Sequence, residues 1–354
     1  MFASFPKLFD KNFVVGFLLP VVLGLIAVAW LCPEIAVLKP LRSVSASEKA
    51  LGDFTYIALL TYVLAILLVT TNTLQYRLLE GYLPPIAWRG AQKHSAKRQA
   101  LVDEYGVLMD RWRVEKAAFP ATDRARADAL KLRLTVEYPP TRLAAMPTAF
   151  GNIIRAFESY PLDVYGVDAT PMWIRLASVI PKEFGEGLDD ARAQVNVFLN
   201  LVFIMPVIFV IATLRTITDT PWRAFLTAAQ NGQLAGWRLL PAPMIGVAAL
   251  LLVILGYRMA LASAKAWGVV VKSAFDCFLP QLVMQLGYAP PASEEERRAF
   301  WGQINSRIVY WQSVDPAHCK LAGAPVAPPK GWSRSLLDRL GGQGNRVKEG
   351  LRRG

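Results

Sequence analysis

Polar residues whose types and spacing could support chemistry are densest between positions 146 and 176. Five residues of this stretch are candidates for a polar site: Asn152, Arg155, Glu158, Asp168 and Arg175. Arg155 and Glu158 stand three residues apart, a spacing that brings them together as an ion pair on one helix face. Two interpretations stay open. The charged residues form either a structural corner with a partly buried salt-bridge network or, with Asn152, a polar site at a membrane surface. Such a site would bind a lipid headgroup or constrict a pore.

Motifs for catalysis, cofactor binding or metal binding are missing from the sequence. None of GxxxxGK[ST], GxGxxG or HExxH occurs. His94 stands among lysines and is expected on a solvated face, while His318-Cys319 has no second Cys/His pair to complete a metal site. The carboxylates of Asp189 and Asp190 are adjacent in sequence and should face different directions on a helix. We predict no catalytic residue, no cofactor and no metal, and we favour a non-enzymatic protein.

Four apolar stretches predict helices that cross a membrane: residues 13–31, 54–69, 195–214 and 239–257. Each is close to the roughly 17–25 residues that an α-helix needs to span a bilayer. The first is longer than the roughly 7–15 apolar residues of a signal peptide and has no clean cleavage site, so we expect it to be retained. No charged residue lies in the middle of any stretch. This argues against an ion-coupled transporter, which needs buried ionisable groups.

The basic residues predict the topology. They crowd the ends of the second and fourth spans, where the sequence has Arg77, Arg89, Lys93, Lys97 and Arg98, and then Arg258, Lys265 and Lys272. Positive charge near span ends favours the cytoplasmic side. We therefore expect both termini and residues 72–194 in the cytoplasm, with the two short loops on the other side of the plasma membrane.

The expected fold is an all-α integral membrane protein with four transmembrane helices and a helical cytoplasmic domain. The cytoplasmic domain would combine the insertion between the second and third spans with the C-terminal region. The predicted parts are a transmembrane hairpin (1–71), the insertion (72–194), a second hairpin (195–257), a helical extension (258–322) and a flexible basic tail (323–354).

Apolar spacing predicts the helices of the cytoplasmic domain. Leu101, Tyr105, Leu108 and Trp112 make one stripe on a helix over 95–118, and Asp123 is expected to cap a second helix over 124–134. Alternating apolar residues leave a strand open near 130–136. Residues 258–287 continue the fourth span as a helix that packs on the insertion or lies at the membrane interface. Ser293 opens a last helix to about 313, with a stripe formed by Trp301, Ile304, Ile308 and Trp311.

The stretch 146–176 also carries a resemblance. Its pattern Pro-Thr-x-x-Gly-Asn-x-x-Arg-x-x-Glu, then Tyr-Gly-x-Asp, then Trp-x-Arg-Leu, resembles a segment of poorly characterised bacterial multi-pass membrane proteins. The resemblance implies the same architecture in a bacterial inner membrane and brings no activity. Read from the residues alone, Thr148 should cap one helix and Asp168 should cap the next, with Pro171 in its first turn.

Two polar features within the spans need partners. Pro20 and Pro206 each free a backbone carbonyl that a neighbouring helix must satisfy. Asn196 and Asn200 lie one turn apart on the third span. Their side chains either form hydrogen bonds to a neighbouring helix or line a polar passage.

The expected partners are the lipid bilayer, further copies of the chain and a protein bound by the cytoplasmic domain. The tail should contact anionic headgroups through Arg339, Arg346, Lys348, Arg352 and Arg353. No nucleic-acid-reading module accompanies it, so we do not expect a nucleic-acid ligand. Two functions follow. One is an oligomeric membrane assembly, such as a channel or membrane-perturbing effector with a cytoplasmic sensing or gating domain. The alternative is a membrane-anchored scaffold or partner-binding subunit.

Overall fold

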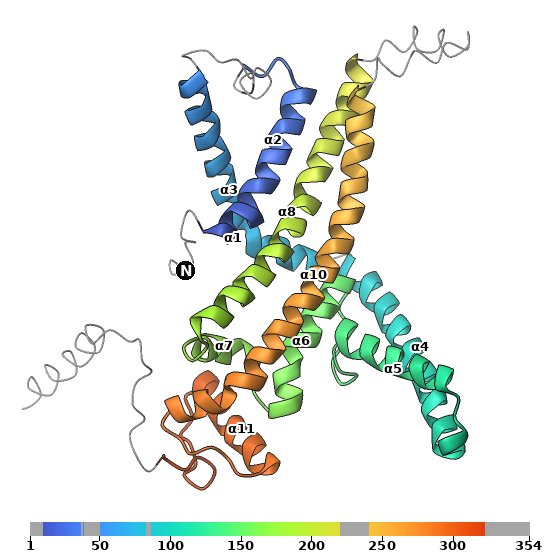
Figure 1. The fold of residues 1–354 in the computed structure, drawn as a ribbon, viewed down its shortest axis with the longest axis vertical. Helices are drawn as coiled ribbons and strands as arrows, with labels where there is room; N and C mark the ends of the chain where they lie inside the picture. The colour runs from blue at the N-terminus through green and yellow to red at the C-terminus, as the bar shows by residue number, and fades with distance from the viewer. Residues whose placement is uncertain (1–9, 37, 39–49, 83–85, 220–240, 323–354) are drawn as a thin grey trace, which may run out of the picture.

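The computed structural model describes residues 10–36, 38, 50–82, 86–219 and 241–322 (Figure 1). Within these ranges the chain is helical, and its only β feature is an isolated bridge between Tyr288 and Leu321. The helices in chain order are α1 (Lys11–Phe13), η2 (Val14–Leu18), α2 (Leu19–Leu31), α3 (Ala50–Glu80), α4 (Ile86–Glu115), η4 (Lys116–Ala118), α5 (Ala121–Glu137), α6 (Ala149–Tyr165), α7 (Ala169–Ala177), α8 (Lys182–Asp219), α10 (Pro241–Gln285) and α11 (Glu294–Tyr310).

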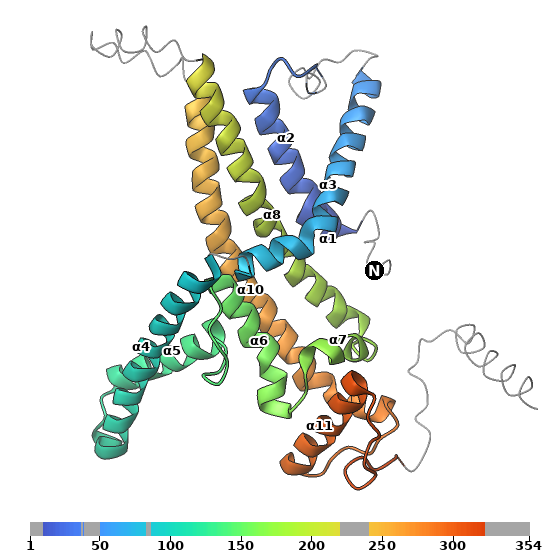
Figure 2. The ribbon, with the colours of Figure 1, turned by 180° about the vertical axis from the view of Figure 1, so that it is seen from behind.

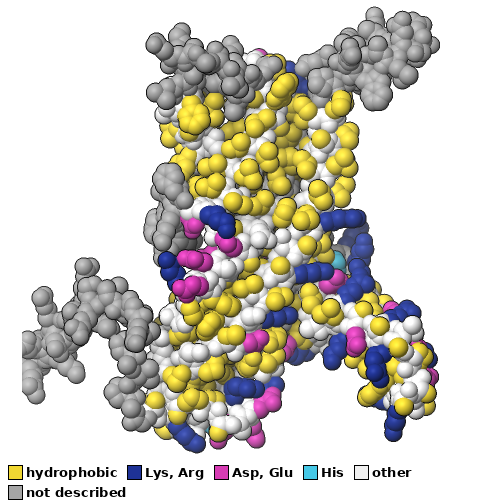
Figure 3. Space-filling model, in the orientation of Figure 1, with side chains coloured by type: hydrophobic (Ala, Val, Ile, Leu, Met, Phe, Trp, Pro, Cys, Tyr) yellow, Lys and Arg dark blue, Asp and Glu magenta, His cyan; other side chains and the backbone are white. Residues whose placement is uncertain are grey.

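The prediction of four helices that are long and apolar enough to cross a membrane is confirmed. In the described chain they cover Lys11–Leu31, Phe54–Glu80, Lys182–Thr218 and Pro243–Gln285. Figure 3 shows that hydrophobic side chains cover the upper half of the molecule, while charged side chains gather in the lower half. We call the upper part, formed by α2, α3 and the adjoining ends of α8 and α10, the apolar half.

Helices α8 and α10 lie side by side and join the two halves of the molecule (Figures 1 and 2). Each runs without a break from the apolar half into the lower half, α8 over Lys182–Asp219 and α10 over Pro241–Gln285. The expected boundaries at 195 and 258 therefore fall inside continuous helices. Two long paired helices make the connection between the halves stiff.

The lower halves of α8 and α10 form one core with α6, α7 and α11, which we call the body. Its fully buried side chains include Phe150, Met172, Leu199, Phe275 and Trp301, one from each of these five helices. The extension after the fourth span thus packs on the insertion rather than standing apart from it.

A second, smaller core holds α4 against α5. Leu101 and Leu108 of α4 pack with Ala127 and Leu130 of α5 and with Phe119 from the turn between them. Figures 1 and 2 show this helical hairpin projecting sideways from the body. We call the hairpin, from Ile86 to Glu137, the arm.

Several predicted helix limits were wrong. Helix α4 begins at Ile86 rather than near 95, and α5 is helical through Glu137, so no strand forms there. Asp123 lies in the first turn of α5, whose N-cap is Pro120. The reason is that α4 and α5 bury apolar faces against each other along their length, which favours longer helices than local capping signals indicate.

Two tryptophans lie outside the stripes to which the spacing assigned them. Trp112 is 45% exposed near the tip of the arm, and Trp311 is 91% exposed. Trp311 ends α11 in the left-handed backbone conformation, at φ 59°, so its side chain leaves the helical face.

Candidate functional site

A polar junction lies where η2, α3 and α8 meet. Pro20 cannot donate to the carbonyl of Gly16 four residues earlier, and the helix locally widens to a π-turn in which the Leu19 N–H bonds to Val14. The side-chain amide of Asn200 donates to the free Gly16 carbonyl at 2.8 Å. The neighbouring helix therefore supplies the donor that Pro20 withholds, and Asn200 is fully buried.

Asn196 forms the other half of the polar junction, one turn earlier on α8. Its side-chain oxygen accepts from the Tyr76 hydroxyl at 3.1 Å and from the Asn72 amide at 3.4 Å. Both asparagines of α8 thus make hydrogen bonds between helices, and both are buried. Neither side chain offers a polar surface to the outside of the chain. Tyr76 and Asn72 come from α3, and no spacing rule in the sequence pairs them with α8.

The first part of the motif stretch forms an elbow that fixes the end of α3 and the start of α6. Thr148 caps α6 by accepting from the Gly151 N–H at 2.9 Å, as predicted, and its hydroxyl donates to the Leu79 carbonyl. The Asn152 amide donates to the carbonyls of Met146 and Thr148, at 2.8 and 2.7 Å, and its oxygen accepts from the Met146 N–H at 2.8 Å. Asn152 is fully buried, and both polar atoms of its side chain make hydrogen bonds to these backbone groups.

Small residues are required at this elbow by close backbone approach. A Cβ at Gly151 would lie 2.6 Å from the Glu80 carbonyl oxygen, and one at Gly90 would collide with the Pro147 carbonyl. Gly81 adopts φ 93°, which strongly favours glycine. The elbow therefore joins α3, α4 and α6 so tightly that side chains are excluded.

The Tyr-Gly-x-Asp part of the motif fixes α6 to the C-terminal helices. The Tyr165 hydroxyl donates to Asp276 of α10 at 2.7 Å, and Gly166 ends α6 at φ 79°. Asp168 caps α7 as predicted, by accepting from the Thr170 N–H at 3.2 Å. The side chain of Asn305 on α11 makes two hydrogen bonds to this turn: its amide nitrogen donates to the Gly166 carbonyl, and its oxygen accepts from the Asp168 N–H.

The predicted salt-bridge network is not present as direct ion pairs. Among the described residues, no ion pair within 4.0 Å joins Arg155, Glu158, Asp168 and Arg175 to one another. The Asp168 carboxylate accepts from the Thr170 N–H at the start of α7, and Arg175 donates to the Pro171 carbonyl at 2.7 Å. Burial raises the pKa of Glu158, the Asp168 charge adds to that rise, and the nearby Arg155 charge opposes it. Asn152, Asp168 and Arg175 therefore make separate local hydrogen bonds, while Arg155 and Glu158 lie near each other without a direct ion pair.

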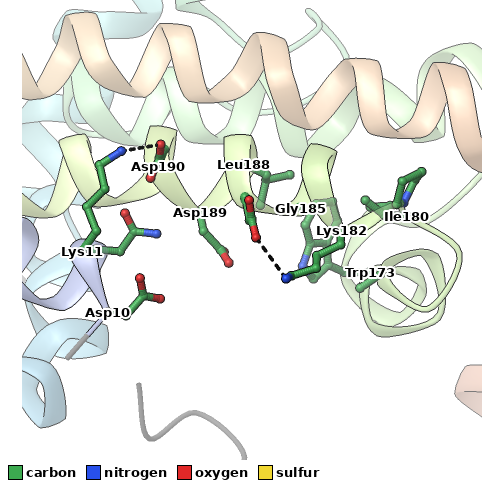
Figure 4. Close-up of a pocket in the computed structure, with 13 residues that line it drawn as sticks. Asp10, Lys11, Trp173, Ile180, Lys182, Gly185, Leu188, Asp189 and Asp190 are labelled. Atoms are coloured by element: carbon green, nitrogen blue, oxygen red, sulfur yellow. Dashed lines mark hydrogen bonds and ion pairs between the residues drawn. The ribbon is translucent and has the colours of Figure 1, made fainter. Parts of the chain in front are cut away.

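An acidic groove of about 970 Å³ lies along the first turns of α8, opposite the start of α1 (Figure 4). Its carboxylates are Asp10, Glu186, Asp189 and Asp190, against two lysines. Lys11 bonds to Asp190 at 2.8 Å, and Lys182 lies 3.6 Å from Glu186. The 186, 189 and 190 spacing was visible in the sequence, but the approach of Asp10 and Lys11 was not. Asp189 and Asp190 both line the groove, and Figure 4 shows the Asp190 carboxylate directed to Lys11 while the Asp189 carboxylate points away from it.

The structure places the remaining predicted site residues as follows. His94 was expected on a solvated face, but it is half-buried with its ring 6.2 Å from the Tyr138 ring. The five basic tail residues, from Arg339 to Arg353, lie outside the described residues. No group of three or more metal-ligating side chains occurs in the part of the chain that the structure describes. Comparisons of the chain with protein families, with curated proteins and with solved structures find no match.

Proposed function

We propose that this chain is a non-enzymatic, multi-pass inner-membrane scaffold that presents its helical arm to a protein partner in the cytoplasm. The observation that carries the proposal is the apolar surface of the arm. Val107, Val114 and Leu132 are 62%, 84% and 66% exposed there, and Trp112 is 45% exposed. Exposed aliphatic and tryptophan side chains on a projecting hairpin are typical of a surface that binds another protein.

The attachment of the arm supports this role. The arm has its own core, and its base is tied to the body by an ion pair between Glu137 and Lys265 at 2.7 Å. Arg98 adds hydrogen bonds to the carbonyls of the segment after α5, the shortest being 2.8 Å to Leu143. An arm that is fixed at its base and free along its sides can hold a partner at a set distance from the bilayer.

Photo-crosslinking in the native cell tests the proposal. A benzoylphenylalanine at Val114 should give a discrete protein adduct, while one at Ile174 is the matched control, because Ile174 is 81% exposed but lies on the body. Replacing Val107 with serine should reduce the Val114 adduct. The scaffold proposal fails if Val114 gives no adduct, or the same adducts as Ile174.

The membrane topology belongs to the same proposal. The basic residues at the base of the arm support a cytoplasmic position for the arm and both termini, and the tail from Arg339 to Arg353 would contact anionic headgroups. Single-cysteine labelling in intact cells, with the native cysteines replaced, provides the test. An impermeant maleimide should label Ser45→Cys directly but should label Ser95→Cys only after lysis. Labelling of Ser95→Cys in intact cells would reverse the topology.

A second candidate is an oligomeric assembly of this chain, such as a channel. It is favoured by α3, because only 11% of the apolar window in Phe54–Glu80 is buried within the chain. A second copy would cover this face, and a benzoylphenylalanine at Leu59, which is 60% exposed on α3, would then give an adduct of twice the mass of the chain. Because Asn196 and Asn200 are buried within one chain, the test of this candidate is the wild-type current in planar bilayers. Absence of wild-type currents would reject the channel.

A further inference from the structure

A cavity of about 210 Å³ lies between the base of the arm and the body. α4 contributes His94 and Lys97, α5 contributes Arg133 and Glu137, and α10 contributes Lys265. By the same kind of measure one water molecule needs only about 10–15 Å³. The cavity is therefore large enough for a tetrahedral oxyanion together with water.

The charges around the cavity do not balance. Glu137 is the only acidic side chain in its lining, and its two oxygens are already occupied by Lys265 at 2.7 Å and by the Arg133 Nε at 2.9 Å. These bonds lower the pKa of Glu137 even though its burial acts in the opposite direction. Lys97 has no ion-pair partner among the described residues, and Arg133 keeps the two terminal nitrogens of its fork. Three cations against one carboxylate leave the cavity positive.

His94 adds an unused polar atom to this positive cavity. Its Nδ1 is buried and has no hydrogen-bond partner among the described residues. Burial and the charges of Lys97 and Lys93 lower the pKa of His94. A neutral imidazole can donate from one nitrogen to an anionic oxygen, and a bound anion would favour its protonated form.

The cavity also lies at a suitable height. Lys265 stands on α10 just past its most apolar section, and α4 follows directly after the end of α3. Figure 3 shows lysine and arginine side chains gathered over α4 and α5, directly below the hydrophobic surface of the apolar half. A phosphate group at a bilayer surface would lie at this level, where basic residues each contribute roughly 1 kcal/mol to the binding of anionic lipid.

We propose that this cavity is a binding site for a phosphate group, held by Lys97, Arg133 and Lys265 with His94 as an additional donor. The anionic headgroup of a membrane lipid and free phosphate share this chemistry. Arg133 would bind two phosphate oxygens with its free fork, and the lysines would act as point charges. Occupancy would link the base of the arm to the body through the ligand, in addition to the Glu137–Lys265 bond.

The test uses the full-length protein, delipidated in detergent at one fixed salt concentration. Dissociation constants are measured for dioctanoyl phosphatidic acid and, separately, for inorganic phosphate. Lys97→Gln should weaken binding about fivefold, the equivalent of one basic residue at the surface. Lys93→Gln is the matched control, because it removes the same charge one turn away on α4 but does not line the cavity. The His94 resonance in isotope-labelled protein, assigned with His94→Gln, should shift during the titration.

Phosphatidic acid binding that depends on Lys97, without binding of inorganic phosphate, assigns the site to a lipid headgroup. The same Lys97 dependence for both probes assigns it to the phosphate group alone. Equal weakening in Lys97→Gln and Lys93→Gln would mean diffuse surface attraction and would overturn the proposal. Failure of both probes to bind, or an unmoved His94 resonance, would overturn it as well. Lys97 is exposed, so its substitution does not threaten the fold, and the unliganded melting temperature checks this directly.

Discussion

The body and the arm are both helical, yet they differ in how many large apolar side chains they bury. The body buries whole aromatic side chains, among them Phe275, Phe300 and Trp301. The arm has a thin core and leaves Val107 and Val114 in solvent. Exposed ion pairs occur in both regions, for example Arg113–Asp110 on the arm and Arg298–Glu294 on the body, and they contribute little to stability. The body therefore holds the larger core of the described chain, and the exposed side chains of the arm support our proposal that it binds a partner.

Removing one tryptophan from the body and one from the arm gives the strongest test of the difference between the two regions. Trp301→Ala should lower the free energy of unfolding by about 3–5 kcal/mol, because it empties a fully enclosed volume. Trp112→Ala in the arm should stay within about 0.5 kcal/mol. Thermal unfolding of both variants in detergent measures this. Equal losses would mean that the arm tip is part of the structural core.

Adding a methyl group at two glycines of α4 separates the elbow from the rest of the arm. Gly90→Ala forces a Cβ against the Pro147 carbonyl and should destabilise the protein by about 1–3 kcal/mol. Gly106→Ala meets no atom within 4 Å and should be neutral or stabilise by up to about 1 kcal/mol. Limited proteolysis of the arm, followed over time, reports both effects. A tolerated Gly90→Ala would show that the elbow can open without cost.

The apolar half gives a third, smaller test. Asn200→Leu leaves the Gly16 carbonyl without its donor and should cost about 1 kcal/mol, the scale of hydrogen bonds between membrane helices. Thr213→Val is the control, because the Thr213 hydroxyl is exposed and donates to the Phe209 carbonyl of its own helix, its one hydrogen bond among the described residues. Melting temperatures in detergent compare the two. A loss with Thr213→Val as large as that with Asn200→Leu would remove the special role of the polar junction.

Local signals in the sequence predicted what local physics decides. Thr148, Asp168 and Ser293 were recognised as caps because an N-cap depends on residues within one turn. The four apolar helices follow from length and composition alone. Pro20 also predicted that a backbone carbonyl of its helix would need a hydrogen-bond donor from a neighbouring helix, and Asn200 supplies it to Gly16.

Local sequence signals could not predict contacts between residues that are far apart in the chain. Nothing in the sequence joins Tyr76 to Asn196, Tyr165 to Asp276, or Lys265 to Glu137, because each pair depends on how distant helices cross. His94 was assigned to solvent from its lysine neighbours, whereas α5 and α10 bury part of it. The motif stretch was considered as a functional site, but Thr148 and Asn152 bond to backbone groups and Gly151 packs against the Glu80 backbone, so these residues fix the elbow.

The pH dependence of the arm base is the smallest expected effect, and it sharpens the comparison at the contact between arm and body. The lowered pKa of His94 means that the unfolded chain takes up a proton more readily than the folded one. The contribution of His94 is therefore present above its ordinary pKa, near 6.5, and is lost as the pH falls from there towards the folded value. The raised pKa of Glu158 acts in the opposite direction, since folding then favours the protonated carboxyl. Comparison with His94→Gln isolates the effect of the imidazole: the melting temperature of the wild type should fall relative to that of the variant as the pH falls from 7.5 to 5. Parallel curves would show that His94 is freely solvated and that the arm base does not exclude water.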